Sequence, residues 1–352
     1  MSIRNLLTDR AQKAIFLAKL FKANGLKAVL RHRNESNAAH IEVLCTSPNV
    51  LLTTANRPRD DIHFRLQKID VLFLLRFSWA ILDVSEIDEL VKKLKAEILQ
   101  FPRHQFMVLC NEEWQVTHFE ASGIEAVFVN SNSFVNETCF SPVINENIQY
   151  AAVYNAAMAP YKRYELSINL PSIMAITYKY SGTYLTDYED KIRSLLPQAY
   201  WVNDEIAKGE KISPNILPSL YAKCGVGLCL SEVEGAMFAS IEYLLCGLPI
   251  VSTYSRGGRD VFFDERFVRV ADPNPVSVAE AVNELISKNI DRQMIRDETI
   301  KKILIHRERF AKALIKYGAT VKVPWEPGSH GAVTARKYSE VEKLVRSGST
   351  SI

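Results

Sequence analysis

The chain has 352 residues, of which 47% are hydrophobic and 24% are charged, and its formal net charge at pH 7 is +3. This length is too great for one ordinary domain, so we expect two domains of similar size that share a cleft. The composition excludes a disordered chain, and since no stretch of about 18 uncharged apolar residues occurs, the sequence predicts no transmembrane helix.

The first segment of the chain is strongly basic, a pattern that can face phosphate or anionic lipid. A run of charges is more often a solvated helix face, so contact with a membrane surface is the lesser alternative. Residues 1–10 carry charges and lack the apolar stretch of a signal peptide. We therefore expect a cytoplasmic protein that could also lie peripherally at the inner membrane surface. The basic residues are Arg10, Lys13, Lys19, Lys22, Lys27, Arg31 and Arg33.

Short β-branched runs alternate with segments of helical period, which is typical of βαβ units and a parallel sheet. The segment 140–149 has a proline and several asparagines but no amphipathic pattern, which favours a linker between two compact units. In the first half the predicted helices include 11–23 and 86–99, and the predicted strands are 28–30, 41–45, 71–75, 106–110 and 126–129.

The second half repeats this alternation and ends in a helical pattern over 297–317 and a charged stretch over 336–346. We place a first Rossmann-like domain over 1–142, a second over 143–323, and a tail or helix over 324–352 that could pack back on the first domain. The predicted strands of the second domain are 150–154, 173–178, 200–202, 226–230, 250–253 and 268–271.

The most informative stretch is 226–260, which reads as strand, loop, helix, strand and loop. Gly247 suits the left-handed position after a helix over 236–246, and Pro249 prevents its continuation. In a parallel sheet, ligands bind beyond the carboxyl ends of strands, where helix N-termini present free N–H groups. Gly235 and Ala236 are predicted at such an end, where little side chain lets a sugar or phosphate approach the backbone.

Two glutamates flank this predicted helix start. Glu234 projects from the loop as an acceptor for sugar or ribose hydroxyls, and Glu242 lies eight residues further on, about 80° round an ideal helix. An isolated pair of this kind is more simply a solvated glutamate and a core polar contact. The glycine and proline positions around the pair favour the interpretation as a ligand site.

The stretch resembles the retaining glycosyltransferases of glycosyltransferase family 4, which have the GT-B fold and a motif of two glutamates separated by seven residues. The resemblance rests on Glu234 to Glu242 (EGAMFASIE), on the following run CGLPIV and on a Gly257-Gly258 loop. It covers about 60 residues. It implies an α/β protein of GT-B architecture, with two Rossmann-like domains whose parallel sheets face each other across a cleft, the first for the acceptor and the second for the donor.

The same resemblance implies roles for individual residues. Glu234 would hold the donor sugar and Glu242 the ribose hydroxyls. The backbone around the helix start would hold the sugar and diphosphate, and the glycine loop would lie beside them. These backbone positions are Gly235, Ala236, Met237, Phe238, Ala239 and Ser240, with Gly257 and Gly258 in the loop.

The family often has an arginine and then a lysine after the first strand of the second domain, and these cations clasp the donor diphosphate. In the segment 155–166, Lys162 matches the lysine, whereas Ala157 stands where the arginine is expected. Arg163, Arg256 or Arg259 could supply the missing charge, because a guanidinium binds phosphate oxygens in a bidentate way. The spacing does not choose among them, and we include Arg163 with the donor-binding residues.

The first domain offers polar residues at predicted strand ends as acceptor-side candidates, although such residues are more often turns or helix caps. The six cysteines lack the two-residue spacing of zinc or redox pairs, and the segment 187–190 is not an Asp-any-Asp metal motif. We therefore expect reduced cysteines, no metal and no cofactor beyond a nucleoside diphosphate sugar as substrate. The acceptor-side candidates are Arg76, Asn111, Glu112, Glu113, Asn130, Ser131 and Asn132.

The sequence thus predicts a metal-independent hexosyltransferase of polysaccharide or glycoconjugate biosynthesis, with Glu234 and Lys162 as its catalytic residues and, by resemblance, retention of configuration. It would move a sugar to a sugar, lipid-linked or small-molecule acceptor. Two alternatives stay open: a non-catalytic nucleotide-sugar-binding or scaffold protein with a degenerate donor site, and a GT-B sugar epimerase. No Gly-any-Gly-any-any-Gly motif follows a predicted strand, which disfavours a dehydrogenase, and we expect no nucleic-acid partner.

Overall fold

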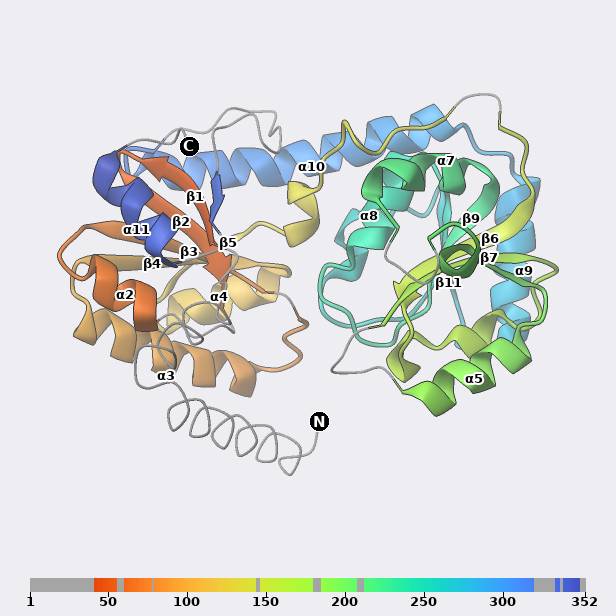
Figure 1. Cartoon of the computed structure of the whole chain (residues 1–352), viewed down its shortest axis with the longest axis horizontal. Helices are drawn as coiled ribbons and strands as arrows, with labels where there is room; N and C mark the ends of the chain where they lie inside the picture. The colour runs from red at the N-terminus through yellow and green to blue at the C-terminus, as the bar shows by residue number, and fades with distance from the viewer. Residues whose placement is uncertain are drawn as a thin grey trace, which may run out of the picture.

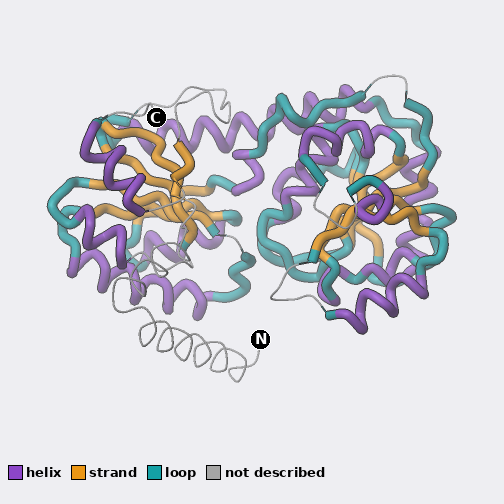
Figure 2. Tube along the Cα trace, in the orientation of Figure 1, coloured by secondary structure: helices purple, strands orange, loops and turns teal. Residues whose placement is uncertain are grey.

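The computed structural model of the chain describes residues 41–55, 60–77, 79–143, 146–179, 185–207, 212–319, 333–335 and 338–348. Two α/β domains lie side by side, and each is built on a central sheet covered by helices (Figure 1, Figure 2). The predicted helix 11–23, the predicted strand 28–30 and the basic first segment lie outside the described residues. No helix within the described ranges is both long and apolar enough to cross a bilayer.

The sheet of the first domain has the strand order β12-β1-β2-β3-β4-β5. The strands β2 to β5 are parallel, whereas β1 runs antiparallel to β2 and β12 antiparallel to β1. The sequence did not predict β2, because its uninterrupted apolar run is only three residues long. The strands are β1 (Ile41–Thr46), β2 (Asn49–Thr54), β3 (Val71–Arg76), β4 (His104–Cys110), β5 (Glu125–Phe128) and β12 (Val333–Ala335).

Helices cover both faces of this sheet, and successive strand residues point to opposite faces. Leu51 packs in the core on the face that α11 covers, whereas its neighbours Val50 and Leu52 pack toward α10. The predicted helix 86–99 corresponds to α3. Asp83 is the N-cap of this helix, and its side chain accepts a hydrogen bond from the Glu86 N–H at 3.2 Å. The helices are α2 (Asp60–Leu66), α3 (Val84–Gln100), α4 (Glu113–Ala121) and α11 (Tyr338–Ser347), with the 3-10 helix η1 (Ser131–Phe134) after β5.

The sheet of the second domain is parallel throughout, in the order β11-β10-β9-β6-β7-β8. This is a doubly wound order in which the winding reverses between β6 and β9, the point where sheets of this kind bind ligands. Its strands are β6 (Tyr150–Ala157), β7 (Ile173–Tyr178), β8 (Ala199–Trp201), β9 (Cys224–Cys229), β10 (Ile250–Thr253) and β11 (Val268–Ala271). Its helices are α5 (Thr186–Leu195), α6 (Val202–Glu205), α7 (Leu217–Ala222), α8 (Phe238–Leu245) and α9 (Pro275–Ser287).

The long helix α10 (Arg292–Ile315) connects the two domains (Figure 1). Ile295 and Ile303 in its first half pack in the core of the second domain, and Phe310 and Leu314 pack against the sheet of the first. The chain therefore returns to the first domain within α10, ahead of the boundary that the sequence suggested at 323. The strand β12 and the helix α11 then complete the first domain.

Two arginines of α10 bind the segment between β5 and β6, which is the first of the two connections between the domains; α10 itself is the second. The Arg307 guanidinium is 2% exposed and donates to both carboxylate oxygens of Glu137, at 2.5 and 2.6 Å, and to the carbonyls of Ser133 and Val135. Arg296 donates to the Glu137 carbonyl at 2.8 Å. The two connections between the domains are thus fastened to each other by buried, charge-assisted hydrogen bonds.

All six cysteines are free thiols, and four of them are buried in the two cores. Burial raises the pKa of Cys224, Cys229 and Cys246 to about 12. These thiols therefore stay protonated at neutral pH and behave as small apolar side chains.

We predict that Arg307→Met lowers the free energy of unfolding by about 3 kcal/mol, because it leaves the Glu137 carboxylate without its buried partner. Adding Glu137→Leu should recover part of the loss, since the pair is then replaced by apolar groups. Lys301→Met on the same helix is the control, because the ion pair of Lys301 with Glu298 is exposed. Urea unfolding followed by circular dichroism measures all three, and equal losses for Arg307→Met and Lys301→Met would contradict the role of the buried pair.

Candidate active site

Lys162 and Glu234 meet at the point where the second sheet reverses its winding. Lys162 ends the 3-10 helix η2 (Pro160–Lys162) that follows β6, and Glu234 lies in the loop that follows β9. The Lys162 ammonium contacts the Glu234 carboxylate directly, and the Ser231 hydroxyl donates to the same oxygen, Oε1, at 2.9 Å. The structure therefore brings together the two residues that the sequence singled out as catalytic.

Both members of this ion pair are largely buried, with side chains 6% and 13% exposed. Burial lowers the pKa of Lys162 to about 8, and the nearby charge of Arg259 acts in the same direction. The adjoining carboxylate of Glu234 opposes that shift, because it favours the charged ammonium. At neutral pH the pair therefore consists of an ammonium and a carboxylate.

The helix α8 begins at Phe238, two residues later than the sequence predicted. Met237 stands at its N-cap with φ 48°, in the left-handed region that favours glycine. The Ser240 hydroxyl, in the first turn of α8, donates to the carbonyl of the N-cap residue Met237 at 2.9 Å. At the other end Gly247 has φ 70°, as predicted for the residue that follows the helix.

Glu242 lies further along α8 in a separate polar network. Its carboxylate accepts from the Tyr221 hydroxyl at 3.0 Å, and that hydroxyl accepts from the Asn155 side-chain amide at 2.7 Å. The backbone N–H of Asn155 donates to the Tyr243 hydroxyl at 2.6 Å. Asn155 and the two tyrosines were missed by sequence analysis, because nothing local marks a residue inside β6 as a partner of α8.

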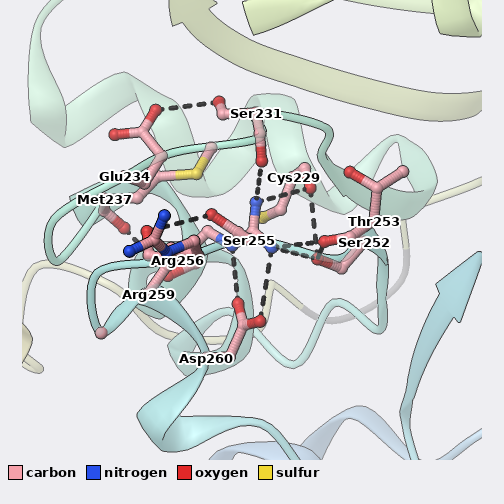
Figure 3. Close-up of polar contacts among 12 residues, drawn as sticks. Cys229, Ser231, Glu234, Met237, Ser252, Thr253, Ser255, Arg256, Arg259 and Asp260 are labelled. Carbon is pink, nitrogen blue, oxygen red and sulfur yellow. Dashed lines mark hydrogen bonds and ion pairs between the residues drawn. The ribbon is translucent and has the colours of Figure 1, made fainter. Parts of the chain in front are cut away.

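The three arginines that could replace the charge missing at Ala157 have different surroundings. Arg259 is 1% exposed and its five N–H groups are taken up by Cys229, Ser231, Ser252, Thr253 and Asp260 (Figure 3). Arg256 donates to the Leu82 carbonyl of the first domain. Arg163 has φ 51° and donates to the Leu230 carbonyl at 2.6 Å and the Thr253 hydroxyl at 2.7 Å. Its guanidinium thus stands at the carboxyl ends of β9 and β10.

Three glycines of this region pack against the first domain. A β-carbon at Gly235 would lie 3.1 Å from the Trp79 backbone, and one at Gly258 would lie 2.8 Å from the Asn111 carbonyl oxygen. At Gly257 it would clash with the Glu234 carbonyl oxygen and with the β-carbon of Ala80. The close approach of the first domain thus leaves no room for a side chain at these positions. Contact of the same glycines with a donor stays a prediction.

The asparagines expected on the acceptor side are buried and bind the second domain. The Asn130 side-chain amide donates to the carbonyls of Asn111 at 3.0 Å and Gly258 at 2.8 Å. The Asn132 amide donates to the carbonyl of Ala236, and Ser131 donates its backbone N–H to the Asn111 side chain at 2.9 Å. Asn130 and Asn132 therefore join the domains, a role that their positions after a strand did not indicate, whereas Ser131 and Asn111 bond to each other within the first domain.

The other acceptor-side candidates also have structural partners. Arg76 forms an ion pair with Glu42 across the first sheet at 3.0 Å. Glu112 caps α4, and burial raises the pKa of its carboxyl group. Glu113 lies in the first turn of the same helix, where a negative charge suits the helix dipole. Within the described ranges, no three His, Cys, Asp or Glu side chains cluster as a metal site would require, and metal independence stays a prediction.

Comparisons with known proteins place this site in a family context. Residues 188–302, which contain Glu234 and Glu242 but not Lys162, match the model of the family Glycosyl transferases group 1. A comparison with curated proteins finds no significant match.

Several solved structures resemble the whole two-domain arrangement at low sequence identity. HepE from Anabaena in complex with UDP has a TM-score of 0.52 and 12% identity, over 74% of this chain and 77% of that one. A glycosyltransferase from Rickettsia africae has 0.51 and 13%, over 77% of each chain. Sucrose-phosphate synthase from Thermosynechococcus elongatus has 0.50 and 14%, over 73% of this chain and 69% of that one.

At these identities the structural likeness shows the fold, and the predicted GT-B architecture is confirmed. The matched domain and the fold together support an enzyme of the hexosyltransferase type. The chain therefore has the GT-B fold of two Rossmann-like domains, and the model of Glycosyl transferases group 1 matches residues 188–302 in the second of them.

Proposed function

We propose that this enzyme transfers a hexose-like sugar from a nucleoside diphosphate sugar to an acceptor hydroxyl, with retention of configuration and without a metal. The observation that carries the proposal is the contact of Lys162 with Glu234 at the β6–β9 reversal point, within a GT-B fold. The similar HepE structure contains UDP, which supports a nucleoside diphosphate donor.

The site offers one group for each end of the bond that breaks. The Lys162 ammonium and the N-terminus of α8 would stabilise the negative charge that grows on the departing diphosphate. Glu234 would accept hydrogen bonds from the sugar and fix its orientation. Without donor, the two side chains neutralise each other in a largely buried place. The diphosphate would then replace Glu234 as the partner of Lys162, and sugar hydroxyls would replace Lys162 as the partner of Glu234.

We assign the second cation of the diphosphate site to Arg163. Arg259 has no N–H group left to offer, and Arg256 reaches across to the first domain. Arg163 lies at the carboxyl ends of β9 and β10, on the edge of the sheet that also carries Lys162. A guanidinium there would compensate for Ala157, which is buried at the end of β6.

The wider biological setting is proposed on the same basis. We propose a role in polysaccharide or glycoconjugate biosynthesis on the cytoplasmic side, with a sugar, lipid-linked or small-molecule acceptor. Membrane contact would come from the basic first segment, which lies outside the described residues. The alternative is a protein that binds nucleotide sugars without turnover. One observation favours it: Ala157 stands where an arginine is expected.

Incubation with UDP-, GDP-, ADP- and dTDP-sugars in the absence of acceptor should identify one donor that raises the melting temperature and is slowly hydrolysed. Lys162→Ala and Glu234→Ala should each lower hydrolysis roughly 100-fold, because charge stabilisation or sugar placement is lost. Lys191→Ala, at an exposed lysine of α5, is the matched control and should hydrolyse the donor like the unaltered protein. Binding without hydrolysis would favour the non-catalytic alternative, and no response to any donor would refute the proposal.

Donor affinity should weaken by about tenfold between pH 7 and pH 9, because the Lys162 ammonium, with its pKa lowered to about 8, loses its proton in this range. The affinity is highest below the pKa, where the cation is present, and falls above it. Lys162→Arg is the control, since a guanidinium stays charged at both values and should bind with little change. Titration calorimetry with the responsive donor measures both proteins, and an equal decline in the two would show that another group titrates.

A further inference from the structure

We propose that Asn132 of the first domain is a positioning residue for the donor site. It holds the turn at Ala236 and Met237, from which α8 begins, so that the site reaches its final geometry only while the two domains are in contact. The part of this inference that concerns donor binding rests on the proposed function.

Asn132 lies in η1, directly after the carboxyl end of β5, and its side chain is fully buried. Its amide Nδ2 donates to the Ala236 carbonyl and lies 3.4 Å from the Ser240 hydroxyl. One side chain of the first domain therefore reaches both sides of Met237 in the second.

The turn that Asn132 holds is one that needs support. Met237 has φ 48°, a conformation that an L-residue with a side chain adopts only when its surroundings impose it. Met237 does not cap α8 with its own side chain. The contact with Asn132 is therefore a constraint that reaches this turn from the other domain.

Neighbouring contacts place Asn132 in a larger interface. The Asn130 side-chain oxygen accepts from the Asn132 backbone N–H at 3.0 Å, while the Asn130 amide donates to the Gly258 carbonyl at 2.8 Å. On the other side of the turn, Gly235 lies against the Trp79 backbone. The first domain thus holds the loops after β9 and β10 together, and the turn at Met237 lies between these contacts.

Packing alone does not explain why a polar residue occupies the buried position of Asn132. Its Oδ1 is buried and has no hydrogen-bond partner among the described residues. A buried acceptor without a partner destabilises the fold, so an apolar residue of the same size would serve packing better. What the amide adds is the donor that meets the Ala236 carbonyl.

A conformation favoured by contact between the domains is coupled to any ligand that binds it better. If the domains separate, the Asn132 bond is lost and the turn at Met237 is free to relax. A donor that requires this turn would then bind more weakly.

The first arm of the test uses the ligand-free protein and hydrogen exchange of the amides in α8. Asn132→Leu removes the donor and keeps the branched shape of the side chain. Asn132→Asp keeps its volume as well and replaces the donor with an acceptor that faces the Ala236 carbonyl. Both should speed exchange in the first turn of α8 by roughly tenfold or more, as expected when one buried hydrogen bond is lost. Unchanged exchange in β9 would show that the variants are folded.

The matched control is Asn136→Ala. Asn136 lies four residues further along the same segment, and its side chain accepts only from Thr138 in the contacts described. It should leave exchange in α8 unchanged. Equal exchange in Asn132→Leu, Asn132→Asp and the unaltered protein would overturn the proposal.

The second arm measures the dissociation constants of UDP and of the responsive donor by calorimetry. Asn132→Leu should raise them by roughly tenfold, and Met237→Gly added to it should recover most of the loss, because glycine adopts this φ without strain. A general structural defect would not be rescued in this way, so additive effects of the two changes would overturn the proposal. If the unaltered protein binds no nucleotide while the exchange arm succeeds, the proposed function fails and the positioning role of Asn132 stands.

Discussion

The guanidinium of Arg259 is the constraint on which the geometry of the site depends. It lies between the carboxyl ends of β9 and β10 and bonds to the carbonyls of Cys229, Ser231 and Thr253 (Figure 3). Three carbonyls from the ends of two neighbouring strands thus share one buried cation. The loops that carry Glu234 and the Gly257-Gly258 pair also bond to each other directly, since the Glu234 N–H donates to the Arg256 carbonyl at 3.0 Å.

This constraint also sets the electrostatics of the site. Burial lowers the pKa of the Lys162 ammonium and the nearby Arg259 cation adds to this shift, whereas contact with the Glu234 carboxylate counteracts it. Lys162 is thus paired with Glu234, and Arg259 is paired with Asp260. The side chains of both cations are buried, so each charge is strongly felt. Such an arrangement favours an incoming polyanion over a neutral ligand, because a polyanion can pair with the lysine when Glu234 is released.

Local patterns in the sequence predicted the parts of the structure that local physics controls. The apolar runs of β3, β4, β7 and β10 and the end of α8 at Gly247 are set by neighbouring residues, and the structure confirms them. The resemblance indicated Lys162 and Glu234 as members of one site. Residues 72 positions apart can meet there because both follow strands of the same parallel sheet. Strand β2 was missed because its short apolar run gives little signal, and the antiparallel β1 and the crossing of α10 depend on partners elsewhere in the chain.

The least predictable features are those in which a polar side chain binds distant backbone. A local rule interprets Asn130 and Asn132 as turn or cap residues after β5, and they do form the cap and the first turn of η1. Their decisive partners, however, are 128 and 104 residues away, respectively. The choice among Arg163, Arg256 and Arg259 has the same origin, since it depends on which N–H groups are already bonded. In this fold the domain that shapes a site need not be the domain that carries its recognisable motif, because the hydrogen bonds to the carbonyls of Ala236 and Gly258 come from η1 of the first domain and from its N-cap.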